Sequence, residues 1–499
     1  MLLNDYDEFD LSYDLNKIPN YTLPDPLINS NGKKIKSLDE WNDFRRQELI
    51  NLFSNHLYGY IPGKLKDLKI TYQSINTNFL NSLATKKEIR IHFDKEIFID
   101  LLIITPNNLV KSSPIFLGMN FFGNHSISKD NITQTSKRII LETSIDYQKK
   151  NNMKKYLTKI RFDKNSLLKA DLKQDNLGYD GIVHGGERIY NGDNLIGRIQ
   201  YNTYLKDLDL YEAMTYLPME LYGSKSDLHV AIHQSFANAK IVDFDPKEMI
   251  GISSSRWPLK KIIENGYGVA TFYYGDIDPD YDDGFQNGIH PLFYKKNQHY
   301  PLSHEWGSIS AWASGLIYCM DYFKTDKDID ENKVAVFGLS RLGKAALWAS
   351  VLDKRFALTI SGNSGNGGAA IWRRKIGETL YSMNKRIPHW LCKNSNKFNH
   401  EEEKLPFDQH TLLSLIAPRP VLIASSATDP LSDPIGEFIG AKNASGVYNF
   451  LNVEGLGVTK LPEKNELIDT RIGYYIRKGK HDITEVDWDN FISFANKYL

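Results

Sequence analysis

One stretch of the chain combines an apolar strand, a tight turn and a serine. Residues 334–350 read VAVFGLSRLGKAALWAS, in which Gly338 precedes Ser340 by two positions and Gly343 follows it by three. Glycines so placed allow a sharp reversal from strand to helix, which lifts a serine hydroxyl above the edge of a sheet. The pattern predicts Ser340 as a nucleophile. A serine at such a junction is also a common helix N-cap, and this alternative stays open.

The residue after this serine is positively charged. The backbone N–H of Arg341 would lie at the N-terminus of the following helix, where the helix dipole favours an anion. We therefore expect an oxyanion to be stabilised there, with the guanidinium adding a fixed charge. The alternative is a surface arginine paired with a nearby carboxylate.

A base for Ser340 must come from elsewhere in the chain. Where a serine sits on such a turn, the order along the sequence is serine, acid, histidine, with the histidine on a loop after the last strand. His481 in GKHDIT follows the apolar run YYIRKG and precedes the last helical stretch. We predict His481 as the base, and an exposed loop histidine without a role is the alternative.

The third member of such a relay is a carboxylate that follows a strand between the serine and the histidine. The run FALTISG leads into Asn363, which cannot carry a charge. The run PVLIASSA leads into Asp429 and then Asp433. We choose Asp429 as the acid and keep Asp433 as the alternative.

Alternating strands and helices would position these residues. Several expected strands are apolar throughout, which is typical of strands covered on both faces. The strands are expected at residues 97–105, 114–122, 268–274, 333–339, 356–362, 420–427, 447–453 and 474–479. Helical spacing occurs at residues 37–58, 306–323, 343–352 and 487–499. The alternation predicts an α/β-hydrolase fold with a doubly wound, mainly parallel sheet.

The alternation breaks in the middle of the chain. The segment at about 128–247 is rich in Asn, Asp, Lys and Tyr, and holds only short apolar clusters. We interpret it as an insertion or subdomain at the rim of the sheet. Residues 1–96 are expected to form a helical and extended segment on the core, and residues 97–499 the hydrolase domain that contains the insertion.

Composition limits the classes of function. The 499 residues include 61 Lys and Arg against 61 Asp and Glu, so the formal net charge is zero. This balance provides no strong field to attract nucleic acid or an anionic membrane, and no apolar stretch approaches the roughly 20 residues of a membrane span. We expect a monomer that acts on a small neutral or weakly charged substrate.

No metal, cofactor or disulfide framework is expected. Cys319 and Cys392 are the only cysteines, and their apolar surroundings predict buried free thiols. No Cys and His spacing is typical of zinc, and no phosphate-binding loop is present. The first residues, MLLNDYDEF, lack a basic region followed by an apolar run, so no signal peptide is expected in this sequence.

Several of these stretches resemble one known family. The bacterial glucuronoyl esterases, carbohydrate esterase family 15, are similar in the runs GLSRLGKAALWASVLDKRFALTIS, SGNGGAAIWRRKIGET, LPFDQHTLLSLIAPRPVLIAS and IGYYIRKGKHDIT. NFFGNH, SSRWP, GYGVATFYYGDIDPD and SAWASGL match the same family. The resemblance covers roughly residues 97–126 and 250–499.

The resemblance implies hydrolysis of the ester that joins glucuronic acid branches of xylan, often 4-O-methylated, to lignin alcohols. It implies an acyl-enzyme on Ser340, a proton relay through His481, and oxyanion stabilisation by Arg341. Lys344 and Glu378 match positions that hold sugar hydroxyls in the family. The resemblance also suggests a secreted or periplasmic location.

Two departures from the family bear on the acid and on the substrate. The earlier of the family's two acid positions, usually Glu or Asp, is Asn363 here, which favours the later position, Asp429. Family members commonly have a Trp two residues after the later acid, where this chain has Leu431. Trp257 in SSRWP is the candidate for stacking on a sugar. The target can therefore be another uronic-acid polysaccharide.

Two other functions stay open. An acetyl or general carbohydrate esterase would use the same triad without needing Arg341, Lys344 and Glu378. A catalytically silent carbohydrate-binding protein would keep the fold, and Asn363 at the earlier acid position is the feature that supports it.

Overall fold

The protein divides into two compact units. The computed structural model describes residues 12–109, 111–130, 149, 155–163, 188–191, 194–205, 210–222, 224, 228–232, 235–242 and 245–499. The sheet unit consists of Leu11–Ser128 and Ser253–Leu499, and the barrel unit of Met1–Asp10 and Lys129–Ile252. The opening residues MLLNDYDEF, on which the expectation of no signal peptide rests, lie outside the described residues.

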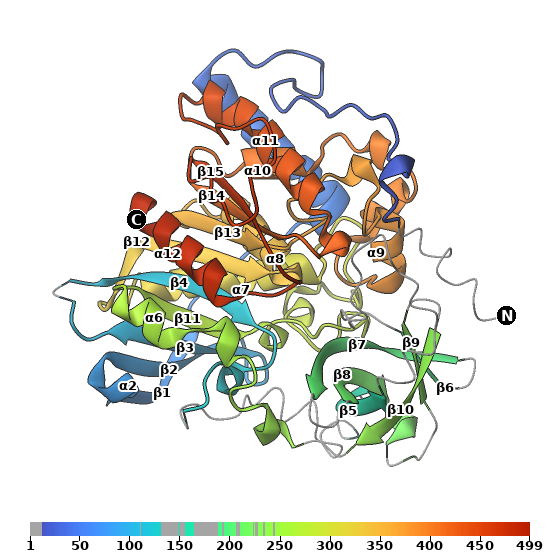
Figure 1. Ribbon diagram of the computed structural model, residues 1–499, viewed down its shortest axis with the longest axis vertical. Coiled ribbons are helices and arrows are strands. Elements are labelled where there is room, and N and C mark those ends of the chain that lie inside the picture. Colours follow the sequence, from blue (N-terminus) through green and yellow to red (C-terminus); the bar gives the residue numbers. More distant parts are fainter. Residues whose placement is uncertain are drawn as a thin grey trace. The chain divides into compact units, whose positions relative to one another are not determined.

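Within the part of the chain that the structure describes, the sheet unit is built on one nine-stranded sheet (Figure 1). The order is β1-β2-β3-β11-β4-β12-β13-β14-β15. The strands from β11 to β15 in this order run parallel, while β1, β2 and β3 add to β11 in antiparallel fashion. Their bounds are β1 Lys69–Asn78, β2 Ala84–His92, β3 Phe98–Pro106, β4 Ser113–Asn120, β11 Gly268–Tyr273, β12 Ile329–Leu339, β13 Leu358–Gly362, β14 Val421–Ser426 and β15 Ile472–Arg477. The predicted mainly parallel sheet is confirmed.

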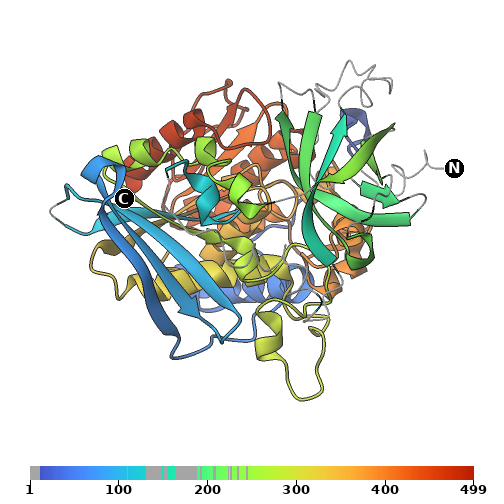
Figure 2. The same ribbon diagram turned by 90° about the horizontal axis from the view of Figure 1, so that it is seen from below.

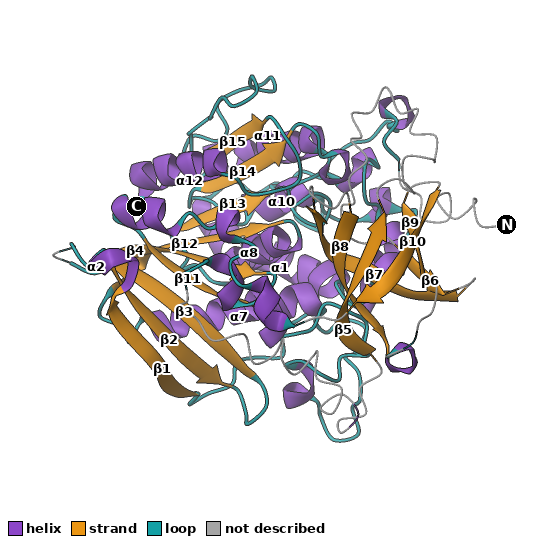
Figure 3. Cartoon of the chain, turned by 60° about the horizontal axis from the view of Figure 1, so that its bottom comes forward, coloured by secondary structure: helices purple, strands orange, loops and turns teal. Residues whose placement is uncertain are grey.

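Burial explains why the parallel strands were recognisable. Every residue of β11, β13, β14 and β15 is buried, so neither face of these strands meets water. In contrast, β1 (KITYQSINTN) is mostly exposed. Figure 3 shows helices gathered around β4 and the strands from β12 to β15, with β1 and β2 extending at one edge. Both β1 and β2 lie in the segment 1–96 and join the sheet, and neither was predicted as a strand from the sequence.

The helices of the sheet unit pack on the parallel strands. Helix α8 packs against α7, β12 and β13, whereas α11 and α12 pack on β14 and β15. The predicted helices at 306–323, 343–352 and 487–499 are confirmed as α7, α8 and α12. The bounds are α1 Arg46–Phe53, α2 Phe79–Ser82, α6 Leu259–Glu264, α7 Ser308–Phe323, α8 Arg341–Leu352, α9 Leu380–Arg386, α10 Gln409–Ser414, α11 Pro434–Phe450 and α12 Glu485–Tyr498.

The predicted helix at 37–58 is also present. Helix α1 is flanked by wider, π-helical turns at Glu40–Arg45 and Ser54–Tyr58. The second of these turns is followed by Gly59, whose φ is 83° and where a Cβ would lie 2.3 Å from the backbone oxygen of Glu305. Only glycine fits this exit without displacing the neighbouring backbone.

The strand predicted at 447–453 is wrong, because these residues end helix α11. Phe438, Ala441, Ala444 and Val447 are buried along one face of that helix at a spacing of three residues. The apolar run VYNFLNV continues this helical pattern. Its β-branched and aromatic residues suggested a strand only when the run was taken without the preceding turns.

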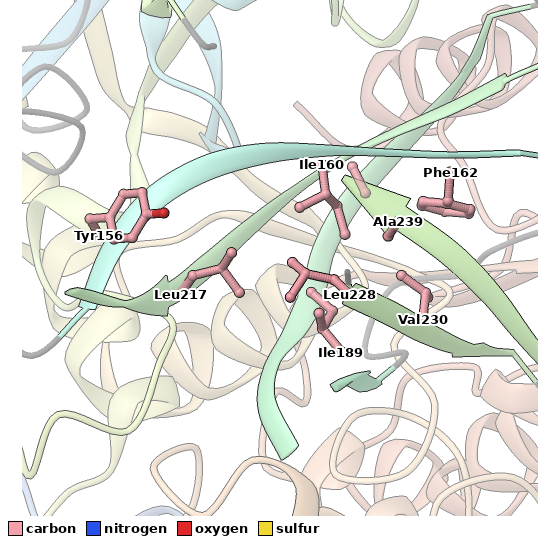
Figure 4. Packing of buried hydrophobic residues seen from close by; sticks show 9 residues of the cluster. Tyr156, Ile160, Phe162, Ile189, Leu217, Leu228, Val230 and Ala239 are labelled. Atoms are coloured by element: carbon pink, nitrogen blue, oxygen red, sulfur yellow. The ribbon is translucent and has the colours of Figure 1, made fainter. Parts of the chain in front are cut away.

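The barrel unit has its own apolar core. Its strands are β5 Lys155–Asp163, β6 Arg188–Asn191, β7 Asn194–Leu205, β8 Leu210–Pro218, β9 Leu228–Ile232 and β10 Ser235–Val242. They pair in the order β10-β5-β8-β7-β6-β9 and close into a barrel (Figures 1 and 2). Side chains from five of the strands gather between them, including Tyr156, Ile160, Phe162, Leu217 and Val230 (Figure 4). Stretches of the segment at about 128–247, for example residues 164–187, lie outside the described residues.

Two further observations concern the whole described chain. Cys319 and Cys392 are both buried and free, as predicted. Among the described residues, no helix has the length and apolar character needed to cross a membrane.

Candidate active site

Ser340 occupies a strained turn between β12 and α8. Its φ of 59° and ψ of −129° lie outside the regions that a serine ordinarily adopts. The turn is tight, because a Cβ on Gly338 would lie 2.2 Å from the backbone oxygen of Leu342. The Ser340 side chain makes no capping hydrogen bond to α8, so the N-cap alternative has no support. Such strain is typical of a nucleophile turn.

The predicted site residues follow the carboxyl ends of neighbouring parallel strands. Ser340 follows β12, Asp429 follows β14 and His481 follows β15, and Asn363, which was not predicted as a site residue, follows β13. Because parallel strands end at the same edge of a sheet, this edge is where their loops meet. The backbone N–H of Ser340 donates to the oxygen of Gly362 at 2.8 Å, which ties the serine turn to the end of β13.

His481 and Asp429 are in direct contact. The distance from His481 Nδ1 to Asp429 Oδ2 is 2.7 Å. Because a carboxylate only accepts hydrogen bonds, the imidazole proton lies on Nδ1, and in the neutral ring Nε2 keeps the lone pair. The His481 side chain is 21% exposed, whereas Asp429 is 1% exposed. The carboxylate is thus buried behind an imidazole that solvent or substrate can reach.

Asp429 stays ionised despite its burial. Burial acts to raise the pKa of Asp429, but the neighbouring His481 and hydrogen bonds from Ser432 and Asn363 outweigh it and lower the pKa to about 2. Asn363 Nδ2 donates to Asp429 Oδ2 at 2.9 Å. The Asn363 amide is itself oriented by Ser426, whose Oγ lies 3.1 Å from Asn363 Oδ1. A chain of hydrogen bonds therefore runs from His481 back to the end of β14.

The alternative acid, Asp433, has a different partner. Its Oδ2 accepts from Arg374 Nε at 2.7 Å and its Oδ1 from Arg374 NH2 at 3.3 Å. This two-pronged ion pair occupies both oxygens. The structure brings Asp429, and not Asp433, to the imidazole.

Arg341 pairs with a buried carboxylate. Its NH1 donates to Asp280 Oδ2, and its guanidinium carbon lies 4.9 Å from the ring centre of Trp390 and 5.9 Å from that of Phe121. The Arg341 side chain is only 16% exposed. The surface-arginine alternative is therefore wrong about exposure, although it anticipated a carboxylate partner.

Lys344, which lies one turn after Arg341 on α8, forms a second polar pair with Glu378. Lys344 Nζ donates to the backbone oxygen of Ser364 at 2.8 Å and lies 3.5 Å from Glu378 Oε2. Arg386 NH1 donates to the other oxygen of Glu378 at 3.2 Å. Burial lowers the pKa of Lys344, and the Glu378 carboxylate opposes this shift. Lys344 also lies 5.6 Å from the ring centre of Trp390, so it belongs to the same cluster as Arg341.

Comparison with known proteins gives a consistent assignment. A family model described as glucuronyl esterase of fungi matches residues 230–452. Carbohydrate esterase MZ0003, from an unknown prokaryotic organism, is 39% identical over 491 residues, covering 98% of this chain and 92% of that protein. The solved structure of a promiscuous CE15 esterase from a marine bacterial metagenome is 37% identical with a TM-score of 0.73, and the match covers 98% of this chain and all of that one. The chain belongs to the glucuronoyl esterases, carbohydrate esterase family 15.

A second solved structure agrees with this assignment. The glucuronoyl esterase from Solibacter usitatus is 31% identical with a TM-score of 0.72, and the match covers 96% of this chain and 99% of that one. The α/β-hydrolase fold expected from the sequence is thus confirmed. This glucuronoyl esterase is a carboxylic-ester hydrolase.

Trp257, the residue predicted to stack on a sugar, is buried. Trp257 is 6% exposed, and its ring packs edge-on against Phe337 at 5.2 Å and near Trp488 at 6.5 Å. A ring covered in this way offers no open face to a sugar. The structure does not support the prediction that Trp257 stacks on the substrate.

The sequence did not reveal two buried residues of the site. Asn363 was considered only as a failed acid, yet it donates to the acid that is present. Asp280 lay unnoticed in the run GDIDPD, and its only sequence signal was an acidic residue in a stretch that resembles the family. Among the described residues, no group of three or more His, Cys, Asp or Glu side chains is arranged to hold a metal ion.

Proposed function

We propose that this esterase hydrolyses esters of glucuronic acid, including 4-O-methylglucuronic acid, through an acyl-enzyme on Ser340. The proposal rests on one observation, the 2.7 Å hydrogen bond between His481 and Asp429 at the sheet edge where Ser340 occupies its strained turn. The name of the Solibacter usitatus relative, a glucuronoyl esterase, and that of the matching family model support a uronate as the acyl group.

In the first half of the reaction, Ser340 Oγ attacks the carbonyl carbon of the ester while His481 Nε2 takes the hydroxyl proton. Asp429 holds the imidazole in the required tautomer and stabilises the imidazolium that forms. The negative charge on the carbonyl oxygen faces the positive end of α8 and the guanidinium of Arg341. His481 then returns the proton to the leaving alcohol as the carbon–oxygen bond breaks.

The second half repeats these steps with water. His481 Nε2 takes a proton from water, which attacks the acyl-enzyme, and the proton returns to Ser340 as the uronic acid leaves. Lys344 and Glu378 present a charged donor and a charged acceptor close to Arg341, and we propose that they bind hydroxyls of the uronate ring.

The natural substrate proposed here is a uronic-acid polysaccharide or its ester, acted on by a monomer. We assign the reaction to the sheet unit, because Ser340, Asp429 and His481 all belong to it. The segment at about 128–247 would be an insertion in a hydrolase domain of residues 97–499. Leu431, which stands where family members commonly have a Trp, leaves the glucuronate of xylan and other uronates as candidate acyl groups.

The test compares ester substrates on wild type and on Ser340→Ala. Benzyl glucuronate should be hydrolysed with a kcat/KM about 100-fold or more above that for p-nitrophenyl acetate, because the acetate offers no hydroxyls to Lys344 and Glu378. Ser340→Ala should lower kcat by about 10⁴-fold with an unchanged melting temperature.

A preference for the acetate would replace the uronate proposal with a general carbohydrate esterase. A wild-type protein that binds xylan oligosaccharides but hydrolyses neither ester would be the silent binding protein instead. Wild-type turnover by Ser340→Ala would remove this serine from the mechanism.

A further inference from the structure

Asp280 is the most fully engaged buried carboxylate near the proposed site. It lies in the loop after β11 and is 3% exposed. Its Oδ1 accepts from His389 Nε2 at 2.9 Å and from Trp390 Nε1 at 2.7 Å. Its Oδ2 accepts from Tyr274 OH at 3.0 Å and from Arg341 NH1. Four donors from three separate stretches of chain therefore hold one carboxylate in a single orientation.

This carboxylate is charged although it is buried. Burial acts to raise the pKa of Asp280, but the charge of Arg341 and the hydrogen bonds from His389 and Trp390 outweigh it and lower the pKa below its ordinary value. The three remaining donors keep Asp280 in place independently of the arginine. Asp280 can thus act as a fixed anchor for a movable side chain.

Arg341 is the side chain that needs an anchor. Its long side chain has several rotamers in a free state and loses them only if its guanidinium is held. The ion pair with Asp280 holds one edge of the guanidinium, and the ring of Trp390 lies 4.9 Å from its carbon. Trp390 therefore links the two groups, since its indole N–H binds Asp280 and its ring lies beside Arg341.

We propose that Asp280 is a positioning residue that fixes the orientation of the Arg341 guanidinium before the substrate binds. The inference rests on the function proposed above, in which Arg341 stabilises the oxyanion. A charge that is already in place when the oxyanion forms stabilises the transition state without a reorganisation cost. An arginine that has to be reoriented in each turnover would contribute less to kcat, while substrate binding through Lys344 and Glu378 would be unaffected.

Asp278 provides a matched control. It is also buried, at 2% exposure, and lies two residues before Asp280. It accepts from Ser308 Oγ on α7 at 2.5 Å and lies 3.1 Å from His290 Nδ1, so neither of these partners contacts Asp280 in the hydrogen bonds described above. Asp278→Asn disturbs the same loop without removing the partner of Arg341.

The experiment is a double-mutant cycle on the full chain with benzyl glucuronate. The variants are Asp280→Asn, Arg341→Ala, their combination, Asp278→Asn, and Asp278→Asn with Arg341→Ala. Asp280→Asn should lower kcat by about 10- to 100-fold with KM changed by less than about threefold. In the Arg341→Ala background the same substitution should change kcat by less than about threefold, because the group that it positions is gone.

The pH profile provides a second readout. Because the pKa of Asp280 is lowered below its ordinary value, Asp280 stays ionised at neutral pH, and Asp280→Asn should lower the plateau of kcat without moving the pH at which activity is half-maximal. Asp278→Asn should have the same effect on kcat in both backgrounds. Melting temperatures of all variants separate a loss of fold from a loss of rate.

The outcomes distinguish this inference from the proposed function. If Asp280→Asn lowers kcat equally in both backgrounds, or not at all, the positioning role is wrong. If Arg341→Ala alone has wild-type kcat, Arg341 does not stabilise the oxyanion, and the role proposed for it above is wrong. Should Asp280→Asn fail to fold, Trp390→Phe removes one donor to Asp280 and keeps a ring beside Arg341. Its smaller loss of kcat must likewise disappear in the Arg341→Ala background, and a persistent loss would overturn the proposal.

Discussion

Two buried carboxylates support the residues around Ser340, and they differ in the charge of their partners. Asp429 faces an imidazole, whose charge changes during the proposed reaction, and its other donors include the neutral amide of Asn363. Asp280 faces a guanidinium, whose charge is permanent, and its other donors are an indole, a hydroxyl and an imidazole. Asp429 is thus suited to a partner that gains and loses a proton, and Asp280 to a partner whose charge is constant.

A third buried carboxyl shows what the charge of Arg341 does for Asp280. Glu437 on α11 accepts from the backbone N–H of Gly365 at 2.9 Å, Ser425 Oγ at 2.6 Å and Ser364 Oγ at 3.3 Å. These donors are all neutral, and burial raises the pKa of Glu437 to about 8. Hydrogen bonds from neutral groups do not lower the pKa of Glu437, whereas the charge of Arg341 lowers that of Asp280.

The largest effect is expected for Asp429→Asn. The amide removes the charge that stabilises the imidazolium and no longer fixes the proton on His481 Nδ1, so kcat should fall by about 10³- to 10⁴-fold. Steady-state kinetics on benzyl glucuronate measures the loss. Asp433→Asn is the control, because Asp433 pairs with Arg374, and it should lower the melting temperature while leaving kcat within about threefold. Equal losses from both substitutions would mean that Asp429 has no special role.

A smaller effect is expected at Asn363. Asn363→Ala removes a hydrogen bond to a charged carboxylate, a contact worth about 1.5–3 kcal/mol, of which part should appear as a roughly tenfold loss of kcat. Asn363→Asp instead places two carboxylates in contact, which raises the pKa of the pair. The pH dependence of kcat/KM should then show an additional ionisation that wild type and Asn363→Ala lack. An unchanged profile would argue against the contact.

Glu437→Gln should alter stability and leave kcat nearly unchanged. The folded-state pKa of about 8 lies above the ordinary value of 4.5, so the native state keeps a proton that the unfolded state releases. The free energy of unfolding of the wild type should therefore fall as the pH rises from about 5 to 8, by an amount on the order of 3 kcal/mol. This loss should level off above about pH 8. Denaturant unfolding of both proteins at pH 5 to 9 measures the difference. Parallel curves for wild type and Glu437→Gln would contradict the raised pKa.

The sequence was informative about the fold wherever burial was continuous. Strands such as β13 and β14 are buried at every position, so an apolar run sufficed to find them. Strand β1 is mostly exposed, and its polar residues gave no such signal. Among the described residues, five of the barrel strands contribute one to three side chains each to their buried core, so no single run was long enough to predict a strand. At 447–453, the preceding turns of α11 decided the structure over local β propensity.

Site residues were predictable where local geometry or chain order constrains them. The turn at Ser340 was predicted from its glycines, and the contact between Asp429 and His481 from their places after successive strands. The pairing of Asp280 with Arg341 depends on the path of a loop after β11, which no spacing in the sequence encodes. The burial of Trp257 was not foreseen for a similar reason, because an aromatic residue in a polar run gives no sign that Phe337 and Trp488 will cover it.

The point where the barrel unit interrupts the sheet unit has a consequence for variation among related enzymes. The chain leaves the sheet unit after Ser128 and returns at Ser253, and the backbone N–H of Ser253 donates to the oxygen of Ser126 at 2.8 Å. The two points of departure and return are therefore already neighbours within the scaffold. A short turn can therefore replace the segment between Ser128 and Ser253 without a change in the order of the strands. Related enzymes can differ in the module at this junction while the sheet that carries Ser340 stays the same.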